Sequence, residues 1–93
     1  MCKMFAGQNP ENYQYTTNSI RLNGQSTSIR LENLFWDVLK EMALIEERSV
    51  PQFISMLHLE VIESQGEIEN FTSLLRCACI IHMEKSNMLK TKM

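Results

Sequence analysis

The fold of this chain is decided by the stretch Ser19-Ile20-Arg21-Leu22-Asn23-Gly24-Gln25-Ser26-Thr27-Ser28-Ile29-Arg30-Leu31. Polar and apolar side chains alternate on both sides of Asn23-Gly24, which is the pattern of half-buried strands. Asn-Gly favours a two-residue type I′ turn, because both central residues of that turn need a positive φ. Such a turn sets three cross-strand pairs: Leu22 with Gln25, Arg21 with Ser26, and Ile20 with Thr27.

The alternation divides the two strands into an apolar face and a polar face. The apolar face holds Ile20, Leu22, Thr27, Ile29 and Leu31. The polar face holds Ser19, Arg21, Ser26, Ser28 and Arg30. Its side chains are short or basic, and none is acidic. The polar face is therefore the first candidate for a binding surface.

After the strands, the apolar spacing changes to the three- and four-residue steps of an amphipathic helix. This helix is predicted from about Asn33 to near Glu47, with Trp36 as a partly exposed anchor. Its apolar positions are Leu34, Phe35, Val38, Leu39, Met42, Ala43 and Ile45.

Two more helices are predicted after a short turn. Ser49-Val50-Pro51-Gln52 is typical of a helix start, with Ser49 as N-cap and Gln52 completing a capping box, and Gly66 is a natural stop. The apolar face of this second helix holds Phe53, Ile54, Leu57, Val61 and Ile62. Asn70 caps a third helix, before a basic tail from Lys85 that we expect to fray. The apolar face of the third helix holds Phe71, Leu74, Leu75, Ala78, Ile81 and Met83.

Length and charge limit the classes of protein that fit. The chain has 93 residues, 44% of them hydrophobic and 22% charged, which suits one small globular domain. Residues 1–31 carry a net charge of +2, residues 32–70 of −7 and residues 71–93 of +3. The mildly acidic total of −2 argues against a nonspecific polyanion binder but leaves room for a local basic surface.

Processing and location follow from the same residues. The first ten residues lack the apolar core of a secretory signal, and the longest apolar run, Cys77 to Ile81, is too short to cross a bilayer. The three cysteines lack the even number and spacing of a disulfide framework, so we expect free thiols and a cytoplasmic location. We expect three parts: an irregular arm over 1–18, the strand and two-helix domain over 19–66, and the third helix with its tail over 67–93.

The order strand, four-turn helix, capped turn and helix resembles the ribbon-helix-helix family of the Arc and Met repressor type. The matching residues are Ser26 to Glu32 in the strand, Phe35, Leu39 and Ala43 in the first helix, Arg48-Ser49 at the turn, and Phe53-Ile54. Met1-Cys2, Phe5 to Gln8, Ser19 to Gly24 and Phe35-Trp36 also resemble a group of small bacterial proteins that carry this domain. The fold class expected is mostly α with a short β ribbon, in a homodimer with an extra C-terminal helix.

The resemblance implies a function and a set of contacts. In that family two chains pair one strand each into a ribbon that enters the major groove of DNA. Ser26, Ser28 and Arg30 then become base contacts, and Arg21, Arg48, Ser49 and Val50 become phosphate contacts at or near a helix N-terminus. A sequence-specific, dimeric transcription regulator that binds double-stranded DNA is therefore expected. We also expect the dimer to be obligate, on the reasoning that one chain cannot bury the strand and both inner helix faces.

Several alternatives stay open at this point. The polar strand face is also what a solvated sheet edge looks like, Ser49 is explained by capping alone, and Arg21 by a surface position. If the segment before Asn23 folds back, a dimer built on the ribbon carries four strands, too wide for the groove. An antitoxin-like or adaptor protein could use the same scaffold to bind a protein through Trp36, the Tyr13/Tyr15 arm or the third helix.

Catalytic and metal chemistry find little support in the sequence. It has no Gly-rich phosphate loop, nucleophile elbow or H-E-x-x-H motif, so no enzyme and no cofactor are expected. Cys77 and Cys79 point about 200° apart on a helix, and Cys79 with His82 supplies only two ligands, so no metal site is expected.

Overall fold

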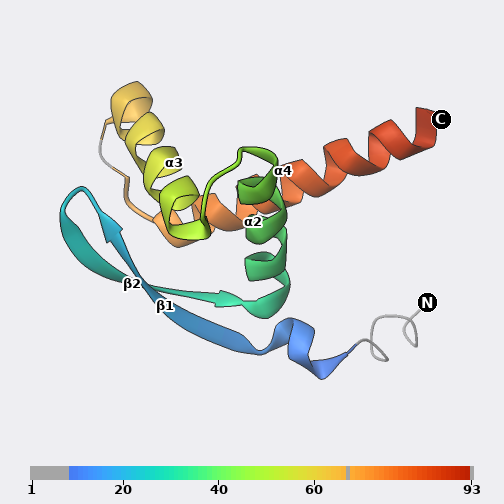
Figure 1. The fold of residues 1–93 in the computed structure, drawn as a ribbon, viewed down its shortest axis with the longest axis horizontal. Coiled ribbons are helices and arrows are strands. Elements are labelled where there is room, and N and C mark those ends of the chain that lie inside the picture. The colour runs from blue at the N-terminus through green and yellow to red at the C-terminus, as the bar shows by residue number, and fades with distance from the viewer. Residues whose placement is uncertain (1–8, 67, 93) are drawn as a thin grey trace.

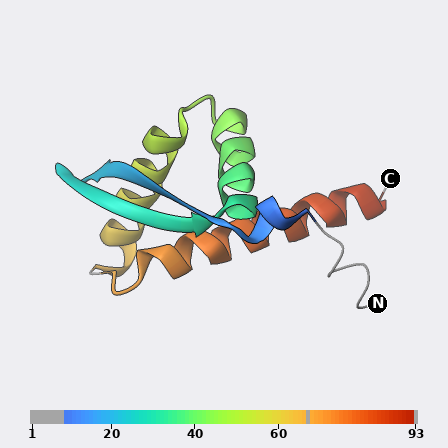
Figure 2. The ribbon, with the colours of Figure 1, turned by 90° about the horizontal axis from the view of Figure 1, so that it is seen from below.

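The computed structural model describes residues 9–66 and 68–92, with side chains described up to residue 86. A 3-10 helix η1 (Pro10–Tyr13) leads into strands β1 (Tyr15–Leu22) and β2 (Gln25–Glu32). Helices α2 (Asn33–Ile45), α3 (Val50–Gln65) and α4 (Phe71–Lys92) follow. The three helices lie on one side of the β1–β2 hairpin (Figure 1), so the hairpin is in front of them when the molecule is seen from below (Figure 2).

The two strands form an antiparallel hairpin within one chain. Leu22 pairs with Gln25, Arg21 with Ser26 and Ile20 with Thr27, as the turn predicts, and the pairing runs on to Tyr15 with Glu32. Asn23 and Gly24 have φ values of 51° and 82°, the signs that a type I′ turn requires. The possibility of a fold-back hairpin is thus confirmed.

The expected irregular arm over 1–18 is wrong for part of its length. Residues 10–13 form η1, and β1 begins at Tyr15, four residues before the alternating stretch that predicted it. Contacts with α2 explain the longer strand. The Trp36 indole N–H donates to the Thr16 carbonyl at 2.9 Å, and the Thr16 hydroxyl donates to the Asn33 side chain.

Trp36 itself is buried, with 5% of its surface exposed, rather than partly exposed as expected. Its indole lies between β1 and α2, and its N–H has a partner there. Burial of a tryptophan is tolerated where its one polar atom is hydrogen-bonded. Trp36 therefore fixes β1 on the helices and offers no surface to another protein.

One chain encloses the hydrophobic core. The buried residues are Ile20, Leu22, Ile29, Leu31, Trp36, Val38, Leu39, Ala43, Phe53, Ile54, Leu75 and Cys79. They come from both strands and all three helices. The obligate dimer stays a prediction, because one chain leaves Leu57, Val61 and Ile62 on the predicted inner face of α3 only partly buried.

The helix ends follow local chemistry. Ser49 accepts from the Gln52 N–H at 3.2 Å and the Gln52 side chain accepts from the Ser49 N–H at 3.1 Å, so the predicted capping box at α3 is confirmed. Gly66 caps the other end of α3 with φ 81°, and Asn70 accepts from the Ser73 N–H. Helix α2 ends at Ile45, two residues before the prediction, with Glu47 at φ 56°.

Helix α4 is joined to the ribbon and to α2. Leu75 and Cys79 are fully buried, and the Arg76 guanidinium lies 3.0 Å from Glu32 Oε1 at the end of β2. Ile81, expected on the inner face, is 51% exposed, because Leu75 and Cys79 define the face that α4 buries. The helix extends to Lys92, beyond the point at which fraying was expected.

Two residues expected on the inner face of α2 are exposed as well. Ile45 is in the last turn of α2 and Leu34 in its first, and the core lies between them. Within residues 9–66 and 68–92, no helix combines the length and the hydropathy that spanning a membrane requires.

Candidate nucleic-acid interface

The face of the hairpin turned away from the helices is polar and exposed. Alternation along the strands puts Ile20, Leu22, Ile29 and Leu31 into the core and the intervening side chains outside. All five residues predicted on the polar face are exposed: Ser19, Arg21, Ser26, Ser28 and Arg30. The predicted base contacts Ser26, Ser28 and Arg30 therefore stand side by side on one strand of this outer face.

Strand β1 adds two residues to the outer face that sequence reasoning missed. Tyr15 and Thr17 lie four and two residues before Ser19, so they point to the same face of the strand, and both are exposed. The Arg30 guanidinium lies 4.4 Å from the centre of the Tyr15 ring, an arrangement that favours the cation. The signal that could have found them was the alternation itself, since Thr17 and Tyr15 continue the polar positions of the strand.

The charge of the outer face is positive. Arg21 and Arg30 are its two exposed cations. Glu32, the acid nearest to it in β2, is partly buried and its Oε1 accepts from the Arg76 Nε at 3.0 Å. The carboxylate is thus neutralised by an arginine of α4, which removes the closest repulsive charge from the path of a polyanion.

The start of α3 lies beside β1. Val50 and Pro51 share a hollow with Asn18, Ser19 and Ile20 of β1. Pro51 and Gln52 border a second hollow together with Arg21 and the Asn23-Gly24 turn. Arg21 is therefore exposed on the outer face and also borders a hollow with Pro51 and Gln52, which follow the predicted phosphate contacts Ser49 and Val50 in sequence.

Most N–H groups at the start of α3 are already used. Those of Ser49 and Gln52 belong to the capping box, that of Phe53 donates to the Ser49 carbonyl, and Pro51 has none. The N–H of Val50 is the one that neither the capping box nor the helix uses. A phosphate at this end gains one backbone donor, unless the capping box opens.

Arg48 has a different environment from the other predicted contacts. It shares a hollow with Glu46, Glu47, Glu60 and Glu63, at the turn between α2 and α3 and along α3. Four glutamates against one arginine along this hollow make this part of the surface acidic. The geometry does not bring Arg48 together with Ser26, Ser28 and Arg30.

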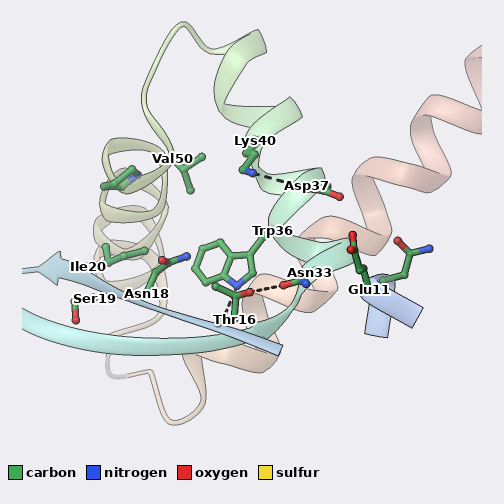
Figure 3. A pocket seen from close by; sticks show the side chains of 12 residues that line it. Glu11, Thr16, Asn18, Ser19, Ile20, Asn33, Trp36, Asp37, Lys40 and Val50 are labelled. Atoms are coloured by element: carbon green, nitrogen blue, oxygen red, sulfur yellow. Dashed lines mark hydrogen bonds and ion pairs between the residues drawn. The ribbon is translucent and has the colours of Figure 1, made fainter. Parts of the chain in front are cut away.

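A hollow of about 640 Å³ opens between η1, β1, α2 and the start of α3 (Figure 3). The Trp36 indole forms one wall, and the exposed pair Lys40–Asp37, 3.9 Å apart, stands at its rim. Polar side chains of η1 and β1, among them Glu11, Asn12 and Asn18, line the rest of the hollow.

Helix α4 carries two cysteines and one histidine, and Cys79 is the buried thiol of the two. Burial raises the pKa of the Cys79 thiol from 9.0 to about 11, and its Sγ contacts the Phe35 carbonyl at 3.7 Å, whereas Cys77 is exposed. His82 Nε2 lies 3.4 Å from Glu41 Oε2 without hydrogen-bond geometry. Among the described residues, no three such side chains are grouped in a way that could hold a metal ion.

Comparison with known proteins identifies the family. A family model described as a ribbon-helix-helix domain matches residues 15–83. The chain therefore belongs to the ribbon-helix-helix domain family, whose members are typically DNA-binding regulators. The solved structure of an uncharacterized protein from Bordetella pertussis Tohama I is 41% identical, with a TM-score of 0.91 over 95% of this chain and 70% of that one. No match was found among curated proteins.

Proposed function

We propose that this protein is a sequence-specific DNA-binding transcription regulator that inserts the outer face of its β1–β2 ribbon into the major groove. The observation that carries the proposal is the composition of that face, with Arg21 and Arg30 among exposed hydroxyl side chains and its nearest acid, Glu32, paired with Arg76. Two strands about 4.8 Å apart fit a groove about 12 Å wide.

Base recognition is assigned to Ser26, Ser28 and Arg30. A guanidinium forms two hydrogen bonds with the O6 and N7 atoms of guanine, which is the commonest specific contact in the major groove. Serine hydroxyls donate and accept, so Ser26 and Ser28 discriminate weakly between bases. Arg30 therefore carries most of the specificity expected from β2.

Phosphate contacts are assigned to the strand-facing side of α3. We assign the phosphate contacts to the Val50 N–H, the Ser49 hydroxyl and Arg21, and the dipole of α3 favours an anion at its N-terminus. Arg48 is the weakest member of this set, because the surrounding glutamates repel a phosphate. Such contacts set the position of the protein and not its sequence preference.

Association of two copies stays a prediction, supported by the fact that ribbon-helix-helix domains typically dimerise. Because one chain already has a two-stranded ribbon, a dimer joined along β2 would carry four strands and would not fit the groove. A dimer able to read DNA must therefore be joined elsewhere. Light scattering at micromolar concentration measures the state, and a monomeric mass would contradict the dimer without touching the DNA proposal.

The proposal is tested by selecting a random duplex library at two salt concentrations. We expect enrichment of a defined site, with affinity falling steeply as salt rises, because phosphate contacts release counterions. Arg30→Ala and Arg30→Lys are expected to lose the enriched guanine, since lysine keeps the charge but not the two-pronged geometry. Lys85→Ala is the matched control, because it also removes one exposed positive charge but lies on α4, outside the residues assigned to DNA contacts.

Absence of any duplex affinity at low salt would refute the proposal. The alternative function, a protein-interaction module of the antitoxin or adaptor kind with no enzymatic activity, would then take its place. Ile80 and Ile81 favour that alternative, because they are adjacent, apolar and exposed on α4. Trp36 does not, because it is buried.

A further inference from the structure

Strand β1 presents a second row of outward side chains next to those of β2. The row holds Tyr15, Thr17, Ser19 and Arg21, all exposed. In the register of the hairpin, Arg21 is opposite Ser26, Ser19 opposite Ser28, and Thr17 opposite Arg30. Nothing in the described part of the chain covers this face when it is seen from below (Figure 2).

The two rows are not equivalent. Arg30 stands near the base of the hairpin, opposite Thr17, and Arg21 stands near its turn. Positions 17 and 21 of β1 are four residue steps apart, which is roughly 14 Å along the ribbon at about 3.4 Å per residue. Base pairs stack at about 3.4 Å, so this separation corresponds to roughly four base-pair steps.

Tyr15 fixes the direction of one of the two cations. Its ring centre is 4.4 Å from the Arg30 guanidinium, and it lies diagonally across the strands from Arg30. An arginine free in solvent loses side-chain entropy when it is ordered on a base, and a partner that orders it in advance reduces that loss. Tyr15 thus acts as a positioning residue for Arg30.

We propose that β1 is the second reading strand of the ribbon, so that one chain recognises two guanines about four base-pair steps apart, one through Arg30 held by Tyr15 and one through Arg21. The inference rests on the proposed DNA-binding function and deepens it. It changes the assignment of Arg21 from a phosphate contact to a base contact. Because β1 and β2 carry different side chains, the core of the site is not palindromic.

The experiment is a random-duplex selection with the full chain and with Arg21→Ala, Arg30→Ala and Tyr15→Leu, followed by measurement of affinity for the enriched duplex and its single-base variants. We expect a core with two guanines about four steps apart. Arg21→Ala should abolish the preference at one of them and Arg30→Ala at the other, each by about 5- to 150-fold. Tyr15→Leu should weaken the preference at the Arg30 guanine only. Lys85→Ala, which removes an exposed cation of α4 outside both rows, is the matched control and should change neither preference.

Three other outcomes overturn the inference, and they differ from one another. If Arg21→Ala weakens binding equally to all sequences and lowers the salt slope by about 1, Arg21 is a phosphate contact. If the enriched site is palindromic and only Arg30→Ala changes it, the second reading strand comes from another chain. Both results leave the proposed function standing. Absence of any salt-dependent duplex binding refutes the function and the inference together.

Discussion

The turn of the ribbon offers a sharp test of the hairpin, through Gly24→Ala. Gly24 has φ 82°, and a Cβ built at this position meets nothing within 4 Å, so no steric clash contributes. The left-handed conformation costs an L-residue about 1–2 kcal/mol. The lower conformational entropy of alanine in the unfolded chain offsets about 0.4–1 kcal/mol of that cost. The substitution should therefore lower the free energy of unfolding by about 1 kcal/mol.

Urea denaturation followed by circular dichroism measures this change. We expect the midpoint to fall by roughly 0.3–1 M with an unchanged slope, since slopes of about 1–3 kcal/mol/M are usual for small proteins. Gly66→Ala is the positive control: Gly66 has φ 81° and the same open surroundings at the end of α3, so a loss of similar size is expected there. An unchanged or raised midpoint for Gly24→Ala would refute the positive φ. A loss above about 3 kcal/mol would show that packing at the turn is involved.

Three further predictions concern the helices. Ser49→Ala removes the N-cap of α3 and should lower the free energy of unfolding by about 1 kcal/mol in thermal melts, and no change would contradict the capping box. Leu39→Ala should cost about 2–5 kcal/mol, whereas Leu44→Ala, at a position 77% exposed, should stay within about 0.5 kcal/mol in the same urea assay. Alkylation at pH 8 with peptide mapping should modify Cys77 faster than Cys79. Folding raises the pKa of the Cys79 thiol from 9.0 to about 11. The stability that comes from its neutral thiol is therefore present below pH 9 and is lost as pH rises toward 11. Equal alkylation rates in the folded protein would show that Cys79 is not buried.

Local chemistry explains which parts of the fold could be predicted. The Asn23-Gly24 turn and the capping box of Ser49 are short-range signals, and both hold in the structure. The stop at Gly66 was visible for the same reason. The end of α2 was predicted two residues late, because Glu47 takes the positive φ that glycine usually supplies. No residue type marked that end.

Long-range contacts explain what could not be predicted. Residues 15–18 became strand because Thr16 bonds to α2 through Trp36 and Asn33, and the sequence does not show these partners. The face that α4 buries was misjudged at Ile81 for a similar reason, since Arg76 binding Glu32 fixes its rotation. On the candidate interface, the polar row of β2 was predictable, and the alternation also extends to Tyr15, while the contact between Tyr15 and Arg30 depends on the pairing register.

The intrachain hairpin also changes how the ribbon comes into being. Its strands are joined by two residues, so their pairing needs only a short loop to close and can form within microseconds. A ribbon made from one strand of each of two chains has to wait for a collision, and its rate of formation rises with protein concentration. Here the ribbon forms by a first-order process, and its surface is complete even in a cell that holds very few copies of the protein.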